Sequence, residues 1–186
     1  SEMCIRDRFN GWTSREITPV GGLSRDEGVR DNSSLEALSK LKPVFMQEGI
    51  VTAGNSSQVS DGAAALLICS KEAAKENGWP VLARIVDFET SGVEPSRVMS
   101  APIPCIEALL SRAELSAEDI DLYEHNEAFA TASCGIKRHF DIPEGKFNIQ
   151  GGAIAIGHPL GASGARCLMS LVSSLQRTEG ALGIVT

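Results

Sequence analysis

The sequence lacks any long apolar run, because its wholly apolar stretches extend over only a few residues. Nothing in it predicts a membrane span, which needs about 20 consecutive apolar residues. It also lacks an excess of basic side chains, since 17 lysines and arginines stand against 24 aspartates and glutamates, for a net charge of -7. This balance argues against nucleic acid or an anionic membrane as the main partner. A phosphorylated small ligand stays open, because it needs only a local cluster of donors.

Paired cysteines are also lacking. The chain has five cysteines, an odd number, and no two of them form a Cys-x-x-Cys pair. No hydrophobic signal segment precedes a cleavage-like site. We therefore expect reduced thiols and a cytoplasmic protein. The five are Cys4, Cys69, Cys105, Cys134 and Cys167.

The chain does have enough apolar side chains for a core. Hydrophobic residues make up 42% of its 186 residues and charged residues 22%, which suits one large domain without a disulfide or metal staple. From residue 80 onward, strand-like and helix-like segments alternate, which predicts an α/β fold with a mostly parallel sheet. The last strand-like segment runs to Thr186 with no turn or polar tail behind it. We therefore expect a sheet that is incomplete at its C-terminal strand.

Periodicity and capping signals place the expected elements. Ser33 and Glu36 have the spacing of a capping box in front of a short helix. Ser70 and Gly78 flank a second helix as its N-cap and its C-terminal glycine. The apolar run at 62–69 fits a buried strand or a piece of helix equally well. The expected strands cover residues 81–88, 119–123 and 181–185, and the expected helices cover residues 35–41, 71–77, 104–113, 127–140 and 165–175.

A glycine-rich stretch at 151–166 contains the tripeptide Gly-His-Pro at 157–159. It leads from a strand-like segment into the strongest helical pattern of the chain, so we expect His158 at a strand-to-helix turn. An imidazole there can act as a base or donate an N–H to a developing oxyanion. A lone histidine is more often structural, and a glycine-rich turn often only packs a helix on a sheet. The stretch is neither a Walker phosphate loop nor a Gly-x-Ser-x-Gly turn.

A second stretch, residues 124–130, also follows a strand and opens a helix. Asn126 fits the N-cap of that helix, or an amide that fixes a water or a substrate carbonyl above the sheet. Active sites of α/β proteins favour the carboxyl ends of strands, where both stretches fall. His125 and Glu127 have no third ligand at a sensible spacing, so we expect no metal. The loop at 52–57 is rich in small hydroxyl residues, which suit an amide-bearing ligand and an ordinary turn equally well.

Taken together, the motifs resemble those of thiolases. They occur in one order along the chain, at 52–57, 60–65, 126–130 and 151–166. The resemblance runs from residue 9 to residue 186 and matches only the second half of a family member. It implies a layered α/β/α half-fold. It divides the chain into an unmatched segment 1–8, the tail of the CoA-binding loop domain 9–60, the last elements of the N-terminal domain 61–79 and a truncated C-terminal domain 80–186.

The same resemblance implies an activity. Thiolases condense two acyl-CoA molecules, or cleave a 3-ketoacyl-CoA with CoA, through a covalent acyl-cysteine. We expect acetyl-CoA C-acetyltransferase activity, with a longer-chain 3-ketoacyl-CoA thiolase as the alternative. CoA thioesters would be the substrates, with no cofactor and no metal. The implied partners are acyl-CoA and CoA, without nucleic acid or membrane, and the full-length enzyme would be a homo-oligomer.

The resemblance also implies roles for individual residues, at the positions that match the motifs of the family. His158 would activate the acyl-accepting cysteine and serve as an oxyanion donor, and Asn126 would hold the water that supplies the second donor. Positions that line the pantetheine channel are matched by Phe45, Ala53, Ser57, Ala128 and Phe129. Arg30 matches a position near the adenine and phosphate end of CoA, and Met99 matches an acyl-pocket position.

The cysteines depart from the family pattern. The acylated cysteine of the family belongs to the first half, and a second cysteine follows the last strand. None of the five cysteines of this chain stands in either context. Two further hypotheses therefore stay open. The chain is a non-catalytic fragment that binds part of CoA, or it is one part of a split enzyme completed by a separate polypeptide. We also expect an exposed apolar face and self-association.

Overall fold

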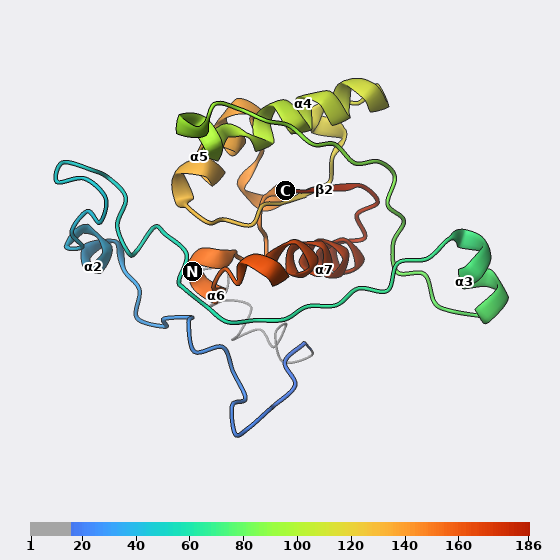
Figure 1. Ribbon diagram of the computed structural model, residues 1–186, viewed down its shortest axis with the longest axis horizontal. Coiled ribbons are helices and arrows are strands. Elements are labelled where there is room, and N and C mark those ends of the chain that lie inside the picture. Colours follow the sequence, from blue (N-terminus) through green and yellow to red (C-terminus); the bar gives the residue numbers. More distant parts are fainter. Residues whose placement is uncertain (1–15) are drawn as a thin grey trace.

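The computed structural model describes residues 16–186, and its most ordered part has three layers (Figure 1). The middle layer is a parallel pair of strands, β1 (Leu122–Glu124) and β2 (Gly183–Val185). Helices α4 (Pro102–Ala113) and α5 (Ala130–His139) lie on one side of it, and α7 (Leu160–Thr178) lies on the other (Figure 1). The expected layered α/β fold with a parallel, incomplete sheet is confirmed.

The sheet directs alternate side chains to its two faces, as the pleat of a strand requires. Tyr123 of β1 enters the core beneath α4 and α5, whereas its neighbour Glu124 reaches an arginine of α7. The register pairs Tyr123 with Ile184, and a single parallel bridge joins Tyr123 to Phe147 on the other side of β1. The Tyr123 hydroxyl donates to the Ala117 carbonyl oxygen at 2.9 Å, which satisfies its one buried polar atom.

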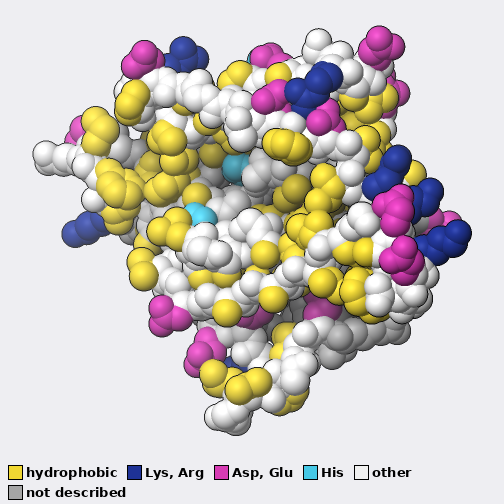
Figure 2. Space-filling model, turned by 45° about the vertical axis from the view of Figure 1, so that its right-hand side comes forward, with side chains coloured by type: hydrophobic (Ala, Val, Ile, Leu, Met, Phe, Trp, Pro, Cys, Tyr) yellow, Lys and Arg dark blue, Asp and Glu magenta, His cyan; other side chains and the backbone are white. Residues whose placement is uncertain are grey.

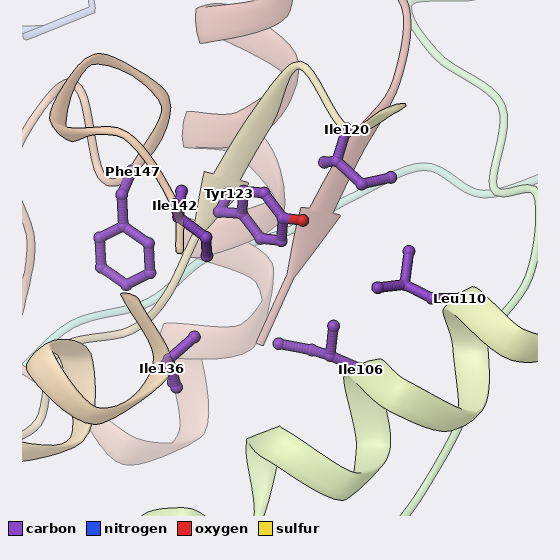
Figure 3. Close-up of a cluster of buried hydrophobic side chains, with 7 residues drawn as sticks. All are labelled: Ile106, Leu110, Ile120, Tyr123, Ile136, Ile142 and Phe147. Carbon is purple, nitrogen blue, oxygen red and sulfur yellow. The ribbon is translucent and has the colours of Figure 1, made fainter. Parts of the chain in front are cut away.

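One hydrophobic cluster joins β1 to α4 and α5 (Figure 3). All of its members are at most 8% exposed, and each contributes about 1.5–3 kcal/mol when fully buried. The cluster consists of Ile106, Leu110, Ile120, Tyr123, Ile136, Ile142 and Phe147. It holds β1 in place, and β1 in turn fixes the residues that follow it.

Helix α7 is longer than the sequence pattern predicts, because it begins at Leu160 and takes up the second part of the glycine-rich stretch. Its buried side chains, which include Cys167 and Leu171, share one face and pack on the sheet. This packing offsets the low helix propensity of Gly161 and Gly164, whose positions open to solvent. The segment before the turn is not a strand, since residues 153–156 form the short helix α6 (Ala153–Ile156).

Helix α5 starts later than expected, and helix α2 has a different cap from the expected one. Helix α5 begins at Ala130, because Glu127 has a φ of 67° and cannot be part of a right-handed helix. Helix α2 (Leu35–Ser39) is capped by Ser34, whose hydroxyl accepts from the Ala37 N–H, so the expected capping box at Ser33 is wrong by one residue. Helix α3 (Lys71–Asn77) has the predicted Ser70 cap and a left-handed Gly78.

The expected strand at 81–88 does not form. Its large apolar side chains are 57–79% exposed, and no strand pairs with this segment anywhere in residues 16–186. β-propensity describes a fit to a half-buried pleated surface, and this segment has no neighbouring strand to supply one. The run at 62–69 likewise forms neither strand nor helix. Figure 2 shows many hydrophobic side chains on one face of the molecule.

The remaining elements are short 3-10 helices. Within residues 16–186 these are η2 (Pro95–Ser100), η3 (Ala117–Asp119) and η4 (Glu144–Lys146). The expected strand at 119–123 therefore starts later, at Leu122, and the last strand is shorter than 181–185. Within residues 16–186, no helix has both the length and the hydropathy needed to cross a bilayer.

Candidate active site

The candidate site lies where β1 leaves the sheet. Asn126 follows β1, and its backbone N–H donates to the Thr186 carbonyl oxygen just beyond β2 at 2.9 Å. His158 directly precedes Pro159, the N-cap of α7. Both residues therefore sit at the carboxyl end of the parallel strands, as the sequence predicts.

Asn126 and His158 are in contact across 32 positions of sequence. The Asn126 side-chain nitrogen lies 3.2 Å from His158 Nδ1 and 3.3 Å from His158 Nε2. Asn126 does not cap helix α5, since the N-cap position is Phe129 and no side chain caps that end. The capping interpretation of Asn126 is therefore wrong. An amide N–H and an imidazole that converge on one place can together stabilise a negatively charged oxygen.

Ser163 holds the His158 ring from its other side. The Ser163 hydroxyl lies 2.6 Å from His158 Nδ1 and donates to the Pro159 carbonyl oxygen at 3.1 Å. The His158 backbone N–H donates to the Gln58 carbonyl oxygen at 3.4 Å. Gly157 makes this turn possible, because it has a φ of 93° and a side chain there would collide with Ser60.

Arg166, which is itself bonded to Glu124, holds the oxygen of the Asn126 side chain. Arg166 donates one N–H to Asn126 Oδ1 at 3.0 Å and another to Glu124 Oε1 at 3.1 Å. Glu124 is only 2% exposed, and this burial raises the pKa of its carboxyl to about 8, although Arg166 acts in the opposite direction. The pair is thus a buried, directional support for Asn126 and not a solvated surface bridge.

His125 and Glu127, considered above as metal ligands, have other partners. His125 Nδ1 lies 2.9 Å from the Thr186 hydroxyl, and the Glu127 carboxylate accepts the Ile154 N–H at 3.4 Å. Burial lowers the pKa of His125 to about 4, and it raises the pKa of Glu127. Gly152 leaves room for Glu127, because a Cβ at Gly152 would lie 2.7 Å from the Glu127 Cβ.

Four of the residues expected to bind CoA lie side by side. Ser57 donates its backbone N–H to the Ala128 carbonyl oxygen at 2.8 Å, and the Phe45 and Phe129 rings meet edge to face with centroids 6.0 Å apart. Ala53 is exposed in the same loop as Ser57. Figure 2 shows histidine side chains in a hollow of this face with hydrophobic side chains around it. These residues form an apolar, partly aromatic wall next to Asn126.

Arg30 and Met99 lie elsewhere. Arg30 is exposed in the loop before α2, where its carbonyl oxygen accepts the Ser33 N–H. Met99 is 40% exposed on η2, which packs against α5. Within residues 16–186, no hydrogen bond or ion pair joins either residue to Asn126 or His158, so their roles stay predictions.

Comparison with known proteins identifies the family. The thiolase C-terminal domain matches residues 79–186, and the thiolase N-terminal domain matches residues 11–72. The chain belongs to the thiolase family. A probable acetyl-CoA acyltransferase of Staphylococcus aureus strain NCTC 8325 is 43% identical over 183 residues, which cover 94% of this chain and 47% of that protein. The chain spans about half the length of the curated relatives it matches.

Solved thiolase structures have the same fold. Human mitochondrial 3-ketoacyl-CoA thiolase superposes with a TM-score of 0.89 at 39% identity, over 99% of this chain and 48% of that one. The same enzyme in complex with CoA gives a TM-score of 0.88 at 37% identity, over 99% and 48% of the two chains. Acetyl-CoA acetyltransferase of Bacillus anthracis gives a TM-score of 0.90 at 36% identity, over 99% and 49%.

Sequence reasoning missed three residues of this thiolase site, Glu124, Ser163 and Arg166. The signal for two of them was present, because Ser163 and Arg166 are three residues apart and therefore share one face of a helix. It was hidden because the expected helix began at residue 165, which left Ser163 in the turn. The expected strand ends at residue 123, just before Glu124, and nothing in the sequence alone pairs Glu124 with Arg166.

Proposed function

We propose that the protein to which this chain belongs is an acyl-CoA acyltransferase of the thiolase type, with acetyl-CoA C-acetyltransferase as the preferred activity. It would condense two molecules of acetyl-CoA, or cleave acetoacetyl-CoA with CoA. The observation that carries this proposal is the contact between Asn126 and both ring nitrogens of His158 at the end of β1. The names of the relatives support the same reaction class.

In the proposed reaction, His158 acts first as a base and then as a donor. The attacking thiol gives its proton to a ring nitrogen of His158, and the resulting thiolate attacks the carbonyl carbon. The new N–H then donates to the thioester oxygen while negative charge collects there. Asn126 would present its amide N–H₂ to a water that supplies the second hydrogen bond. The proton therefore stays within the site and is returned to the leaving group.

The acyl-accepting thiol would come from outside residues 16–186. Cys167 is the cysteine next to the pair, with its sulfur 3.9 Å from Asn126 Oδ1. It is only 1% exposed, and burial raises its pKa to about 11, so it is neither accessible nor ionised near neutral pH. Since this chain spans about half of its relatives, we propose that the rest of the enzyme supplies the cysteine.

CoA would bind along the wall next to Asn126. The rings of Phe45 and Phe129 offer an apolar surface to the pantetheine arm, and Ala53, Ser57 and Ala128 line the same place. Arg30 would meet the phosphates, and Met99 would contact the acyl group. The solved complex of a related thiolase with CoA supports CoA as the ligand. A homo-oligomer of the whole enzyme remains an expectation.

A chimera tests the catalytic proposal. This chain replaces the matching residues of the Staphylococcus aureus relative, so that the relative supplies the rest of the enzyme on both sides, and thiolysis is followed by the loss of the 3-ketoacyl thioester. We expect turnover of acetoacetyl-CoA with CoA, and faster turnover of it than of a sixteen-carbon 3-ketoacyl-CoA. Faster turnover of the long substrate would favour the alternative, a longer-chain 3-ketoacyl-CoA thiolase. A folded chimera without thiolysis of either substrate would contradict the catalytic proposal.

A second candidate function is non-catalytic binding of CoA by this chain alone. The inaccessible Cys167 favours it, because no other thiol within residues 16–186 contacts the pair. The purified chain is mixed with acetoacetyl-CoA and CoA, and CoA binding is measured by titration calorimetry. We expect binding without thiolysis, and weaker binding in the Phe45→Ala variant. Thiolysis above background would exclude this second candidate.

A further inference from the structure

We propose that Ser163 and Arg166 are positioning residues that fix the two partners of the candidate site. They lie three residues apart on α7, so their side chains leave the same face of the helix. Ser163 contacts the His158 ring and Arg166 contacts the Asn126 amide. One turn of one helix thus orients both groups.

Ser163 selects the tautomer of His158. A hydroxyl has one proton, and the Pro159 carbonyl oxygen, 3.1 Å from Ser163 Oγ, is able only to accept it. The hydroxyl oxygen must then accept the proton of His158 Nδ1, which lies 2.6 Å away. This leaves the lone pair on Nε2. In this tautomer, Nε2 can accept an N–H of the Asn126 amide, whose nitrogen lies 3.3 Å away.

Arg166 selects the orientation of the Asn126 amide. A guanidinium group has donors and no acceptor, so only the oxygen of the amide can face it. Arg166 donates to Asn126 Oδ1 at 3.0 Å and also to the Asn126 backbone oxygen at 3.3 Å. Its other terminal nitrogen donates to the buried Glu124 carboxylate, which fixes the guanidinium group. The amide N–H₂ is thereby turned toward His158.

The two selections agree with each other. The Asn126 amide nitrogen lies 3.2 Å from Nδ1 and 3.3 Å from Nε2, and with the Nδ1 proton directed at Ser163 its acceptor is Nε2. A bare Nε2 is also what a base requires, since only an unprotonated nitrogen can take a proton. The catalytic consequence rests on the proposed thiolase function. The hydrogen-bond pattern itself rests only on contacts among residues of this chain.

Nitrogen NMR on the full 186-residue chain tests the Ser163 half of this inference. The protein is labelled with ¹⁵N-histidine, and the signals of His158 are identified by their loss in the His158→Asn variant. In the wild type we expect Nδ1 to be protonated and Nε2 to be bare. In Ser163→Ala the proton should move in part or wholly to Nε2. In Ser163→Thr, which restores the hydroxyl, it should stay on Nδ1.

Ser174→Ala is the matched control. Ser174 is also buried on α7 and bonds Gln150 far from His158, so the control should leave the His158 signals unchanged. A His158 that keeps its Nδ1 proton in Ser163→Ala would overturn the inference. So would a wild type in which Nε2 carries the proton.

The side-chain amide signals of Asn126 test the Arg166 half. Lysine at this position keeps a cation beside Glu124 but loses the fork that also reaches Asn126. In Arg166→Lys we expect the two Asn126 N–H signals to shift and to broaden, and in Arg177→Gln, on the same helix, we expect no change. Unchanged Asn126 signals in Arg166→Lys would contradict the proposal. These spectra need no substrate, so their outcome and that of the chimera assay stand independently.

Discussion

Residues 102–186, the packed region, bury many of their large apolar side chains, whereas residues 16–100, the open region, leave theirs exposed to solvent. The first region encloses a cluster in which Ile106 and Ile136 are 1% exposed, whereas the second leaves Ile85 and Phe88 57% and 79% exposed. Both regions have apolar segments of similar length. The difference is that the first region supplies both a sheet and the helices that cover it, while the second has no paired strand of its own. The presence of a covering layer, and not the number of apolar residues, therefore decides which region has a buried core.

The candidate site uses both regions. His158 and Asn126 belong to the packed region, and the buried Glu124 and Arg166 support them. Phe45 and Ser57 come from the open region, and the loop that contains Ser57 is bonded to the packed region, for example from the Ser57 N–H to the Ala128 oxygen. We infer that the proposed chemistry depends on the packed region, whereas the proposed CoA binding draws on both regions, because Ala128 and Phe129 belong to the packed one.

The largest expected effect comes from removing the imidazole. His158→Ala in the active chimera should lower kcat about 10³-fold or more, because base and oxyanion donor are lost together. Thiolysis of acetoacetyl-CoA measures this effect. The Ser174→Ala variant is the control and should retain most of the activity. A loss below about tenfold for His158→Ala would mean that His158 is not the catalytic base, and that the packed region does not hold the proposed chemistry.

The next effect compares stability in the two regions. Ile136→Ala should lower the free energy of unfolding by about 2–5 kcal/mol, because it leaves a cavity between α5 and β1. Ile85→Ala should change it by less than about 0.5 kcal/mol, because that side chain already faces solvent. Denaturant titration followed by circular dichroism measures both. Equal losses for the two variants would mean that the open region is packed in solution.

The histidine beside the site predicts a pH dependence. Burial, with a contribution from Arg166, lowers the pKa of His125 from its ordinary 6.5 to about 4. Between about pH 6.5 and pH 4, His125 therefore binds a proton in the unfolded chain but not in the folded chain. The stability due to His125 is full above pH 6.5 and is lost as the pH falls through about 4, by roughly 3 kcal/mol in all.

Unfolding of the wild type and of His125→Gln at pH 7 and pH 4 isolates this contribution. The raised pKa of Glu124 acts in the opposite direction in both proteins and cancels in the difference. The variant should lose less stability on acidification than the wild type. The same loss in both would show that His125 is solvated, contrary to its 8% exposure.

The sequence predicts the packed region far better than the open one. In the packed region, the helix at 104–113 and the parallel sheet follow from periodicity, since each is stabilised by contacts within the chain. In the open region, the helix at 71–77 follows from its own caps, Ser70 and Gly78. The strand expected at 81–88 fails because β-structure depends on a partner that local sequence cannot supply. In the site, motif order predicts His158 and Asn126. The support from Glu124 and Arg166 requires the fold, because 42 positions separate them.

The smallest expected effect concerns self-association through the open region. Its exposed apolar side chains, Phe88 among them, should make the chain associate, since exposed apolar patches of this kind favour contact between molecules. Phe88→Lys should lower the weight-average mass in sedimentation equilibrium and leave the unfolding free energy nearly unchanged, because Phe88 contributes little to the core. Leu160→Lys is the control. Leu160 is 82% exposed, but it lies at the start of α7 in the packed region, so its charge should not reduce association. If the wild-type chain sediments as a clean monomer, the open region is closed over in solution, and the contrast between the two regions does not hold.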